Sequence, residues 1–295
     1  MRTIVSVGDP SGIGPELFAQ LILDEPQWLE RGDFILTGPP RLWRQLGLEE
    51  GPNLQFQGSP VEGTLPTPGI PCAKGAEIQC RGFLEALEIV QEDESASLLT
   101  LPVNKEQLNK AGITFLGHTE YFRIAYPSRK ITMAFRSDAY WLALVTDHLA
   151  LQDVPERLHE EDLIKSATQL YEASQKPLAI CGLNPHAGEA GLMGDDELRL
   201  APALVQIRSK GIPCRGFIAA DSFFAHWDPK EAVLALYHDQ GLSPFKALFH
   251  GQSCQISLGM PFRRVSPDHG TAYSLAGTGK ADPGSLRQAL KEALR

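Results

Sequence analysis

The sequence predicts an α/β fold with a largely parallel sheet. Segments with the spacing of buried strands alternate with segments of helical spacing along nearly the whole chain, which is typical of this class. The 295 residues are too many for one small core and suit one large domain or two closely joined ones. Hydrophobic residues make up 43% and charged residues 21%, as in an ordinary globular protein.

In the first part of the chain, short apolar runs predict strands and periodically spaced apolar residues predict helices. A proline at an early position opens the first helix, and the Gly- and Pro-rich stretch 51–72 predicts a loop with short extended pieces. The predicted strands are 3–7, 34–37 and 97–103, and the predicted helices are 15–23, 41–46, 76–92 and 105–111.

The second part continues the alternation. Residues 131–135 and 141–145 predict a pair of strands, and 160–174 predicts an amphipathic helix. The further predicted strands are 178–181, 216–219, 232–237 and 255–258, and the further predicted helices are 197–209, 272–276 and 284–294. No internal repeat or low-complexity segment interrupts this pattern.

Charge and composition exclude several classes of protein. The net charge is −9 with a pI near 5.4, and no dense run of Lys and Arg provides the basic patch that nucleic acids or membrane surfaces need. No apolar stretch is long enough to span a bilayer, and the N-terminus lacks a cleavable signal pattern. The five cysteines are scattered and form no Cys-x-x-Cys pair, which indicates reduced thiols. We therefore expect a cytoplasmic protein that binds neither nucleic acid nor membrane.

Three histidines each follow a short apolar run that predicts a strand: His148, His186 and His238. In α/β proteins the carboxyl ends of the strands face the ligand crevice. Three imidazoles there can hold one divalent metal and leave a coordination position for substrate.

The neighbours of these histidines strengthen the metal hypothesis. A carboxylate lies close in sequence to each of them, and such groups orient imidazoles or neutralise the cation. A lone histidine is nevertheless more often a hydrogen-bonded structural residue, and the chain has eight. The residues alone therefore favour separate structural roles over one shared metal.

Two glycine-containing motifs can bind an anion. Residues 8–16 (Gly-Asp-Pro-Ser-Gly-Ile-Gly-Pro-Glu) lie between a predicted strand and a predicted helix, where backbone amides favour negative charge. In the second, Gly117-His118-Thr119-Glu120, Thr119 can cap a helix over 121–124 while His118 and free amides hold a phosphate. Neither is a G-x-G-x-x-G sequence or a P-loop. A tight turn at 8–16 and a plain helix cap at 117–120 also explain these residues, and the residues alone favour that explanation.

Two later stretches carry basic side chains. Lys246 comes shortly after the 237–242 motif, which follows the predicted strand 232–237. It can therefore reach the ligand crevice at the strand ends, although most lysines are solvated at the surface. Residues 263–283 combine Arg263 and Arg264 with many glycine, polar and turn residues. A stretch of this length without predicted regular structure indicates a binding loop, and arginine binds phosphate in bidentate fashion.

Together these motifs resemble the 4-hydroxythreonine-4-phosphate dehydrogenase family. The resemblance runs from Gly8 to Ser285 and rests on six motifs in the family's order: residues 8–16, 117–120, 147–149, 184–189, 237–242 and 268–272. It implies a fold similar to isocitrate and isopropylmalate dehydrogenases, with two α/β domains around a cleft and no Rossmann fingerprint. We expect the first domain at 1–111 plus 265–295 and the second at 112–264.

The resemblance also implies the roles of individual residues. The expected metal ligands are His148, His186 and His238, and the expected substrate-binding residues are His118, Thr119, Lys246, Gln255 and Arg264. The expected cofactor-binding residues are His269, Gly270, Thr271, Ala272, Ser274, Gly277 and Asp282. Asp239 and Lys246 are the candidates for the catalytic proton acceptor, by proximity in sequence only. The family further implies a homodimer whose active sites are completed across the subunit interface.

The implied reaction is an oxidation by NAD or NADP that also needs one divalent metal. The C3 hydroxyl of 4-phosphooxy-threonine is oxidised and the resulting β-keto acid loses CO2. Three imidazoles suit zinc, and cobalt or magnesium can also support turnover. The alternatives are a related dehydrogenase that acts on threonate or erythronate 4-phosphate, a dihydrodiol dehydrogenase, which the basic residues argue against, and a non-catalytic member of the fold.

Two positions depart from the family's pattern. Gln255 stands where asparagine is usual, so the amide is kept but reaches further. Ser274 stands where an acidic residue is common, and a carboxylate there would bind the ribose hydroxyls and repel a 2′-phosphate. The preference between NAD and NADP is therefore open. The chain is also short for the family, chiefly through trimmed loops such as 51–72.

Overall fold

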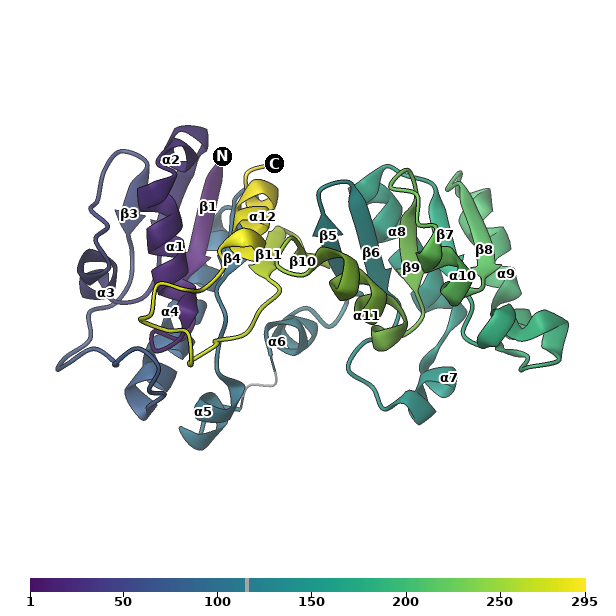
Figure 1. Ribbon diagram of the computed structural model, residues 1–295, viewed down its shortest axis with the longest axis horizontal. Coiled ribbons are helices and arrows are strands. Elements are labelled where there is room, and N and C mark those ends of the chain that lie inside the picture. Colours follow the sequence, from purple (N-terminus) through teal and green to yellow (C-terminus); the bar gives the residue numbers. More distant parts are fainter. Residues whose placement is uncertain (115–116) are drawn as a thin grey trace. The chain divides into compact units, whose positions relative to one another are not determined.

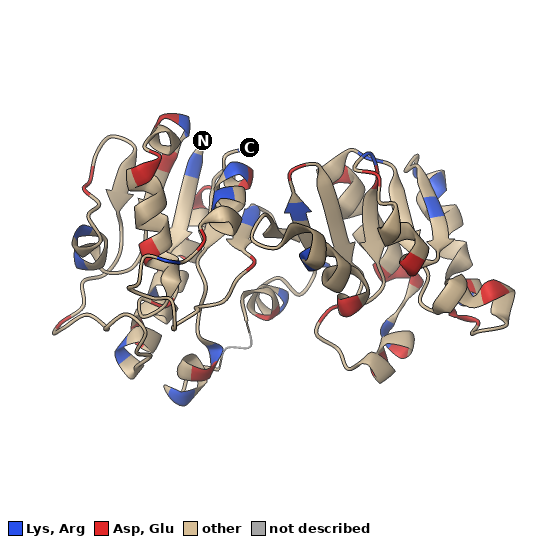
Figure 2. Cartoon of the chain, viewed as in Figure 1, with Lys and Arg blue, Asp and Glu red and all other residues tan. Residues whose placement is uncertain are grey.

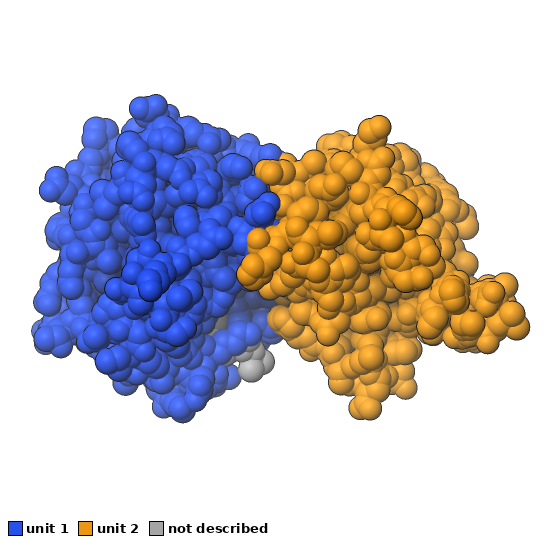
Figure 3. All heavy atoms as spheres, viewed as in Figure 1, with its two compact units in different colours: residues 1–125, 251–256, 260–295 blue, residues 126–250, 257–259 orange. Residues whose placement is uncertain are grey.

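The computed structural model describes residues 1–114 and 117–295, which form two compact units (Figure 3). Unit 1 contains Met1–Ala125, Gly251–Ile256 and Met260–Arg295, and unit 2 contains Tyr126–His250 and Ser257–Gly259. Both chain termini therefore belong to unit 1, and strand β10 (Cys254–Leu258) carries the chain from one unit into the other.

Unit 1 is built on a sheet with the strand order β3-β2-β1-β4-β11-β10, in which the five strands from β3 to β11 pair in parallel (Figure 1). The strands are β1 (Arg2–Ser6), β2 (Asp33–Leu36), β3 (Leu54–Phe56), β4 (Ser97–Thr100) and β11 (Arg263–Pro267), beside the already named β10. The central strands β1 and β4 are almost wholly buried, because helices cover parallel strands on both faces.

The helices of unit 1 enclose this sheet. They are α1 (Ile13–Asp24), α2 (Gln27–Arg31), α3 (Pro40–Gln45), α4 (Ala73–Glu92), α5 (Lys105–Lys110), α6 (His118–Ala125) and α12 (Gly284–Ala293). Helix α4 packs on β1 and β4, and α12 packs on β11 and β4. Phe18 of α1 meets Phe34 and Trp43 edge to face, so aromatic side chains fill the space between α1, β2 and α3.

Unit 2 has the strand order β5-β6-β9-β7-β8. Strands β5 (Thr132–Ser137) and β6 (Tyr140–Leu144) form an antiparallel hairpin, as their sequences predict. Strands β9 (Ala232–Ala235), β7 (Leu178–Cys181) and β8 (Cys214–Ile218) then continue the sheet in parallel from β6. Every residue of β7 and β9 is buried, which requires cover on both faces of the sheet.

Helices supply that cover. They are η1 (Leu151–Asp153), α7 (Val154–Arg157), α8 (Glu160–Ser174), η2 (Pro185–Gly191), α9 (Asp196–Ser209), α10 (Ala220–Ala225) and α11 (His238–Phe249). Helices α8 and α11 both pack on β6 and β9. Phe245 of α11 packs with tilted rings against Phe135 and Trp227 in the core. Helix α11 is thus fixed against the sheet by its apolar side chains.

Several predicted elements differ from those in the structure. Residues 272–276 form turns rather than the predicted short helix, and Arg263–Pro267 is strand β11 rather than the start of a loop. Helix α11 is not predicted from the sequence, because Gly241 and Pro244 lie within it. Helix α6 begins at His118, so Thr119 lies inside its first turn instead of capping it.

The division between the two units also differs from the predicted one. The sequence places 112–264 in the second domain, whereas 112–125, 251–256 and 260–264 belong to unit 1 in the structure. The reason is strand pairing: β11 lies in register beside β4, with Arg264 opposite Leu98. The spacing of apolar residues within a segment does not predict which distant strand it pairs with.

Charged residues are distributed in the same way along the chain in both units. Figure 2 shows basic and acidic residues interspersed along the ribbon of both, in keeping with the absence of a basic run in the sequence. Among helices of the described residues, none combines the length and apolarity needed to cross a bilayer.

The close approach of α11 to the sheet gives a stability prediction. A Cβ atom on Gly241 would lie 2.7 Å from Leu142 Cδ1 and 2.8 Å from Ala235 Cβ. We expect Gly241→Ala to lower the free energy of unfolding by about 1–3 kcal/mol, because overpacking forces neighbours to move. Gly51→Ala, where no atom lies within 4 Å, is the control. Equal urea midpoints for the two variants would contradict this packing.

Candidate functional site

The three histidines of unit 2 follow the carboxyl ends of three neighbouring parallel strands. His148 follows β6, His238 begins α11 directly after β9, and His186 lies in η2 after β7. The pairing of β6 with β9 extends beyond the strands, since Thr146 N donates to Leu236 O. The register therefore carries the segments that hold His148 and His238 to the same edge of the sheet.

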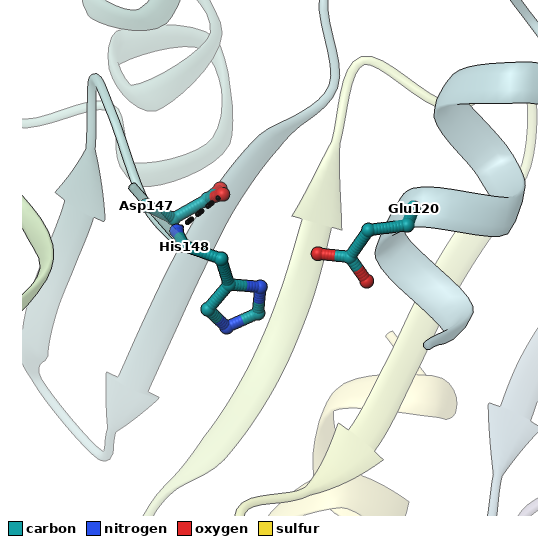
Figure 4. Close-up of side chains that lie close together, drawn as sticks. All are labelled: Glu120, Asp147 and His148. Atoms are coloured by element: carbon teal, nitrogen blue, oxygen red, sulfur yellow. Dashed lines mark hydrogen bonds between the residues drawn. The ribbon is translucent and has the colours of Figure 1, made fainter. Parts of the chain in front are cut away.

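His148 and His238 lie beside each other at this edge. Their ring centroids are 5.7 Å apart and both line a cavity of about 270 Å³. The backbone N–H of His148 donates to Oδ1 of the buried Asp147 at 2.9 Å, which fixes the turn that carries the ring (Figure 4). Oδ1 of Asp239 lies 2.7 Å from Nδ1 of His238. With a proton on Nδ1, this contact leaves Nε2 as the nitrogen that can bind a ligand.

His186 lines a second, larger cavity of about 590 Å³ together with Asn184 and Gln240. Tyr237 lines both cavities, so His186 and the His148–His238 pair lie around one tyrosine. Gln240 joins the strands beneath: its Oε1 accepts from Leu236 N, and its Nε2 donates to Gly182 O. The sequence shows the 237–242 motif but gives no signal for this bridging role.

The backbone at His186 is unusual. All five residues from 186 to 190 have positive φ, between 45° and 77°, and only Gly188 among them is a glycine. The left-handed conformation costs roughly 1–2 kcal/mol for a residue with a Cβ atom. Contacts from outside the segment must therefore hold it.

Three of the expected substrate-binding residues form one hydrogen-bonded group in unit 1, and a fourth, His118, lies next to it in sequence. Arg264 of β11 donates through Nη1 to Gln255 Oε1 at 3.1 Å, and Gln255 Nε2 lies 3.4 Å from Thr119 Oγ1. His118 precedes Thr119 in the first turn of α6. Lys246, the fifth expected residue, lies on α11 of unit 2.

Arg264 is held by partners that the sequence does not reveal. Its Nε and Nη2 donate to Thr100 Oγ1 at 3.1 and 2.6 Å, and its guanidinium lies 5.8 Å from the ring centre of Phe122. Ser266 donates to Gln255 Oε1, so the carbonyl of Gln255 accepts from two residues. The side chain of Gln255 thus helps to fix Arg264.

The electrostatics of this group suit an anion. Burial lowers the pKa of Arg264 to about 9, against a smaller opposing effect of Glu120. Burial also holds the pKa of His118 well below its usual value, and the positive charges of Arg264 and Lys105 lower it further. An arginine that is still cationic at neutral pH, with little water around it, binds a phosphate strongly.

The expected cofactor loop lies in unit 1 between β11 and α12 and packs on residues 8–16. Thr271 O accepts from Ile13 N at 2.9 Å, and Glu16 Oε2 accepts from Gly277 N at 2.6 Å. A Cβ atom on Gly12 would lie 2.8 Å from Thr271 O, so this approach requires glycine. The structure therefore joins two motifs that lie at opposite ends of the sequence.

Tyr273 anchors the middle of this loop and is not singled out by the sequence. Its hydroxyl donates to the buried Asp9 Oδ2 at 2.5 Å and accepts from Asn104 Nδ2. Burial and the Asp9 carboxylate raise the pKa of Tyr273 to about 12. Ser274, the next residue, is exposed and carries no charge.

The remaining expected cofactor residues lie along the same loop. His269 Nδ1 is 2.9 Å from Gly270 O, and Asp282 Oδ1 accepts from Gly284 N at 2.8 Å at the start of α12. Ala272 has a φ of 42°, and its carbonyl accepts from Leu275 N in the turn that replaces the predicted helix. The loop is therefore ordered by its own turns as well as by residues 8–16.

The two units define an α/β protein of the isocitrate dehydrogenase-like class. The isocitrate dehydrogenase of Methylococcus capsulatus, 13% identical, aligns with a TM-score of 0.52 over 99% of this chain and 84% of its own, which confirms the predicted fold class. Two further comparisons give higher identities.

The 4-hydroxythreonine-4-phosphate dehydrogenase of Erwinia tasmaniensis is 35% identical over 317 residues, covering 99% of this chain and 96% of that protein. The crystal structure of the enzyme of the same name from Klebsiella pneumoniae aligns with a TM-score of 0.82 at 28% identity, covering 100% of this chain and 98% of its own. The family model of the pyridoxal phosphate biosynthetic protein PdxA matches residues 45–293. The chain belongs to the PdxA family, which confirms the resemblance seen in its motifs.

The partly buried His118 predicts a pH dependence of stability. Its pKa is lower in the folded protein than the value of about 6.5 in an unfolded chain. The free energy of unfolding is therefore unaffected by His118 protonation above about pH 6.5. Below that pH it falls by up to about 1.4 kcal/mol per pH unit, because the unfolded state binds the proton more readily. We expect His118→Asn to lose less stability than the wild type between pH 7 and pH 5 in urea titrations. Parallel curves would show that His118 is protonated equally in both states.

Proposed function

We propose that this chain oxidises 4-phosphooxy-L-threonine (4-hydroxy-L-threonine phosphate) at C3, with decarboxylation to 3-amino-2-oxopropyl phosphate, using NAD or NADP and one divalent metal. The product enters pyridoxal phosphate biosynthesis. Membership of the PdxA family and the name of the Erwinia relative support this proposal. The observation that carries it is the set of three histidines after neighbouring strands of unit 2.

His148, His186 and His238 would hold the metal. Imidazole nitrogens are ligands for zinc, which is our proposed metal, and cobalt or magnesium remain candidates. The close rings of His148 and His238, and the carboxylate on His238 Nδ1, fit such a site. A divalent cation there supplies Lewis-acid stabilisation of negative charge on a substrate oxygen.

The group around Arg264 would bind the substrate phosphate. Arg264 and His118 supply the donors, while Thr119 and Gln255 fix their positions. Lys246 of unit 2 is the fifth proposed substrate-binding residue. Binding a phosphate remote from the reacting carbon places that carbon for the reaction. The hydrogen bonds of Arg264 to Thr100 and Gln255 hold the guanidinium in place before the substrate arrives.

Asp239 and Lys246 are the proposed proton acceptors for the C3 hydroxyl. Both lie on α11, Asp239 in its first turn and Lys246 further along the helix. The contact of Asp239 with His238 gives this carboxylate the additional task of orienting the ring. The acceptor would take the proton of the C3 hydroxyl, and the nicotinamide of NAD or NADP, when bound, would supply the hydride acceptor.

The loop from His269 to Asp282 would bind the nucleotide. The expected contacts are with His269, Gly270, Thr271, Ala272, Ser274, Gly277 and Asp282. The neutral, exposed Ser274 offers no carboxylate that would repel a 2′-phosphate, so we propose that both NAD and NADP are accepted.

We further propose a cytoplasmic homodimer in which the subunits complete each other's active sites. Leu149 and Leu151 are 43% and 67% exposed and directly follow His148, while Leu192 is 83% exposed shortly after His186. Apolar side chains exposed beside an active site are typical of a subunit interface. The five free cysteines fit a reducing compartment.

A related activity on 4-phosphothreonate or 4-phosphoerythronate is the second candidate, because the Arg264 group recognises phosphate and not the amino group. Turnover with 4-phosphothreonine and 4-phosphothreonate, measured side by side, separates the two. Presence of all three histidines argues against a non-catalytic member of the fold.

The metal assignment predicts the behaviour of a His238 variant. We expect His238→Ala to lose bound zinc and at least 100-fold in turnover, because one of three ligands is removed. Elemental analysis and initial rates measure these quantities. His226→Ala, which removes an exposed histidine of the same unit, is the control and should retain both. Full activity of metal-free His238→Ala would refute the proposed function.

The phosphate assignment predicts a selective effect at Arg264. We expect Arg264→Ala to raise KM for the phosphorylated substrate roughly 100-fold, because charged hydrogen bonds to the phosphate are lost. The nucleotide Kd should change little. Arg263→Ala is the matched control, since Arg263 pairs with Glu292 instead. Equal losses of substrate and nucleotide binding in Arg264→Ala would contradict the assignment.

A further inference from the structure

The segment that carries His186 cannot hold its conformation by itself. His186, Ala187, Glu189 and Ala190 all have left-handed backbone angles, which side chains disfavour. Within the segment's neighbourhood, Ala187 N donates to Asn184 O and Met193 N donates to Gly188 O. These bonds close the turn but do not attach it to the rest of unit 2.

Glu197, in the first turn of α9, makes that attachment together with its neighbour Asp196, whose Oδ2 accepts from Asn184 Nδ2 at 3.1 Å. Glu197 is only 7% exposed. Its Oε1 accepts from the backbone N–H of Asn184 at 2.7 Å, and its Oε2 accepts from Asn184 Nδ2 at 3.0 Å. Asn184 precedes His186 by two residues, so the carboxylate fixes the entry to the left-handed turn.

The same carboxylate also packs against both sides of the turn. A Cβ atom on Gly182 would lie 3.1 Å from Glu197 Oε1, and a Cβ atom on Gly188 would lie 2.5 Å from Oε2. Only glycine at 188 leaves room for the carboxylate at this distance. The Glu197 carboxylate thus contacts the backbone on both sides of His186, at Gly182 and at Gly188.

Burial of the Glu197 carboxylate carries a cost in stability. In the described part of the chain, the hydrogen bonds to Glu197 all come from Asn184, and no cation forms an ion pair with it. Burial of a charge on so few neutral donors is unfavourable for stability. This cost is consistent with a role for Glu197 in the geometry of the site.

We propose that Glu197 is a positioning residue, whose buried carboxylate holds the left-handed turn that presents His186 and thereby sets the affinity of the histidine site for a divalent cation. This inference rests on the proposed function, in which His186 is a metal ligand. Glu197 itself touches neither the metal nor the substrate.

The test is the Zn²⁺ affinity of the full-length protein, measured by competition with a chromophoric chelator. We expect Glu197→Gln to weaken Zn²⁺ binding about tenfold, because the amide donates where a second acceptor is needed and the turn loosens. Asp195→Asn is the matched control: it removes an exposed charge two residues away that caps nothing, and should bind Zn²⁺ as the wild type does.

A rescue separates positioning from a general loss of stability. Ala190 is exposed and has a φ of 57°, so Ala190→Gly favours the left-handed turn without removing buried contacts. We expect the Glu197→Gln/Ala190→Gly double variant to recover at least threefold of the lost affinity. Absence of any recovery, with both proteins folded by circular dichroism, would overturn the positioning role.

His186→Ala distinguishes this inference from the function on which it rests. If His186→Ala binds Zn²⁺ as tightly as the wild type, the proposed metal site is refuted and the role of Glu197 with it. If His186→Ala weakens binding while Glu197→Gln does not, only the role of Glu197 is refuted. Should Glu197→Gln fail to fold, Asn184→Ser removes a single donor to the carboxylate, and unchanged Zn²⁺ affinity there would refute the inference equally.

Discussion

Parallel pairing of β6, β9 and β7 is the constraint on which the candidate metal site depends. Each of these strands is followed directly, or after one short turn, by a histidine segment. Because parallel strands end at the same edge of a sheet, the pairing collects three segments that are far apart in sequence. Gln240 reinforces it by bonding to the ends of β9 and β7 together. The positions of the rings are therefore a consequence of backbone register.

Unit 1 holds a positively charged side chain, Arg264, in a buried position. Arg264 lies in a strand that is buried on both faces, where a guanidinium has few water molecules to replace its hydrogen bonds. Thr100 and Gln255 supply acceptors, and Phe122 supplies a ring face. Thr100 and Gln255 hold the guanidinium in a fixed position, and a cation fixed in this way suits an anionic ligand.

Both units use loops that are fixed by contacts from distant segments. The 269–282 loop is held by residues 8–16 and by the bond of Tyr273 to Asp9, and the turn at His186 is held by Glu197. Loops that carry function on a rigid scaffold commonly depend on such contacts. Ser274 lies in the 269–282 loop and is exposed, whereas Gln255 lies in strand β10.

The sequence by itself determined the α/β class, the bounds of elements such as 160–174 and 178–181, and the candidate histidines, because helical period, apolar runs and strand-end polarity are local properties. The tertiary structure decided that Arg263–Pro267 is a strand of unit 1 and that Gly241 lies within a helix. It also decided that Thr100, Tyr273 and Glu197 support the proposed sites. These features depend on which distant segments meet, and pairing between segments is set by register and packing across the whole unit, which no local pattern contains.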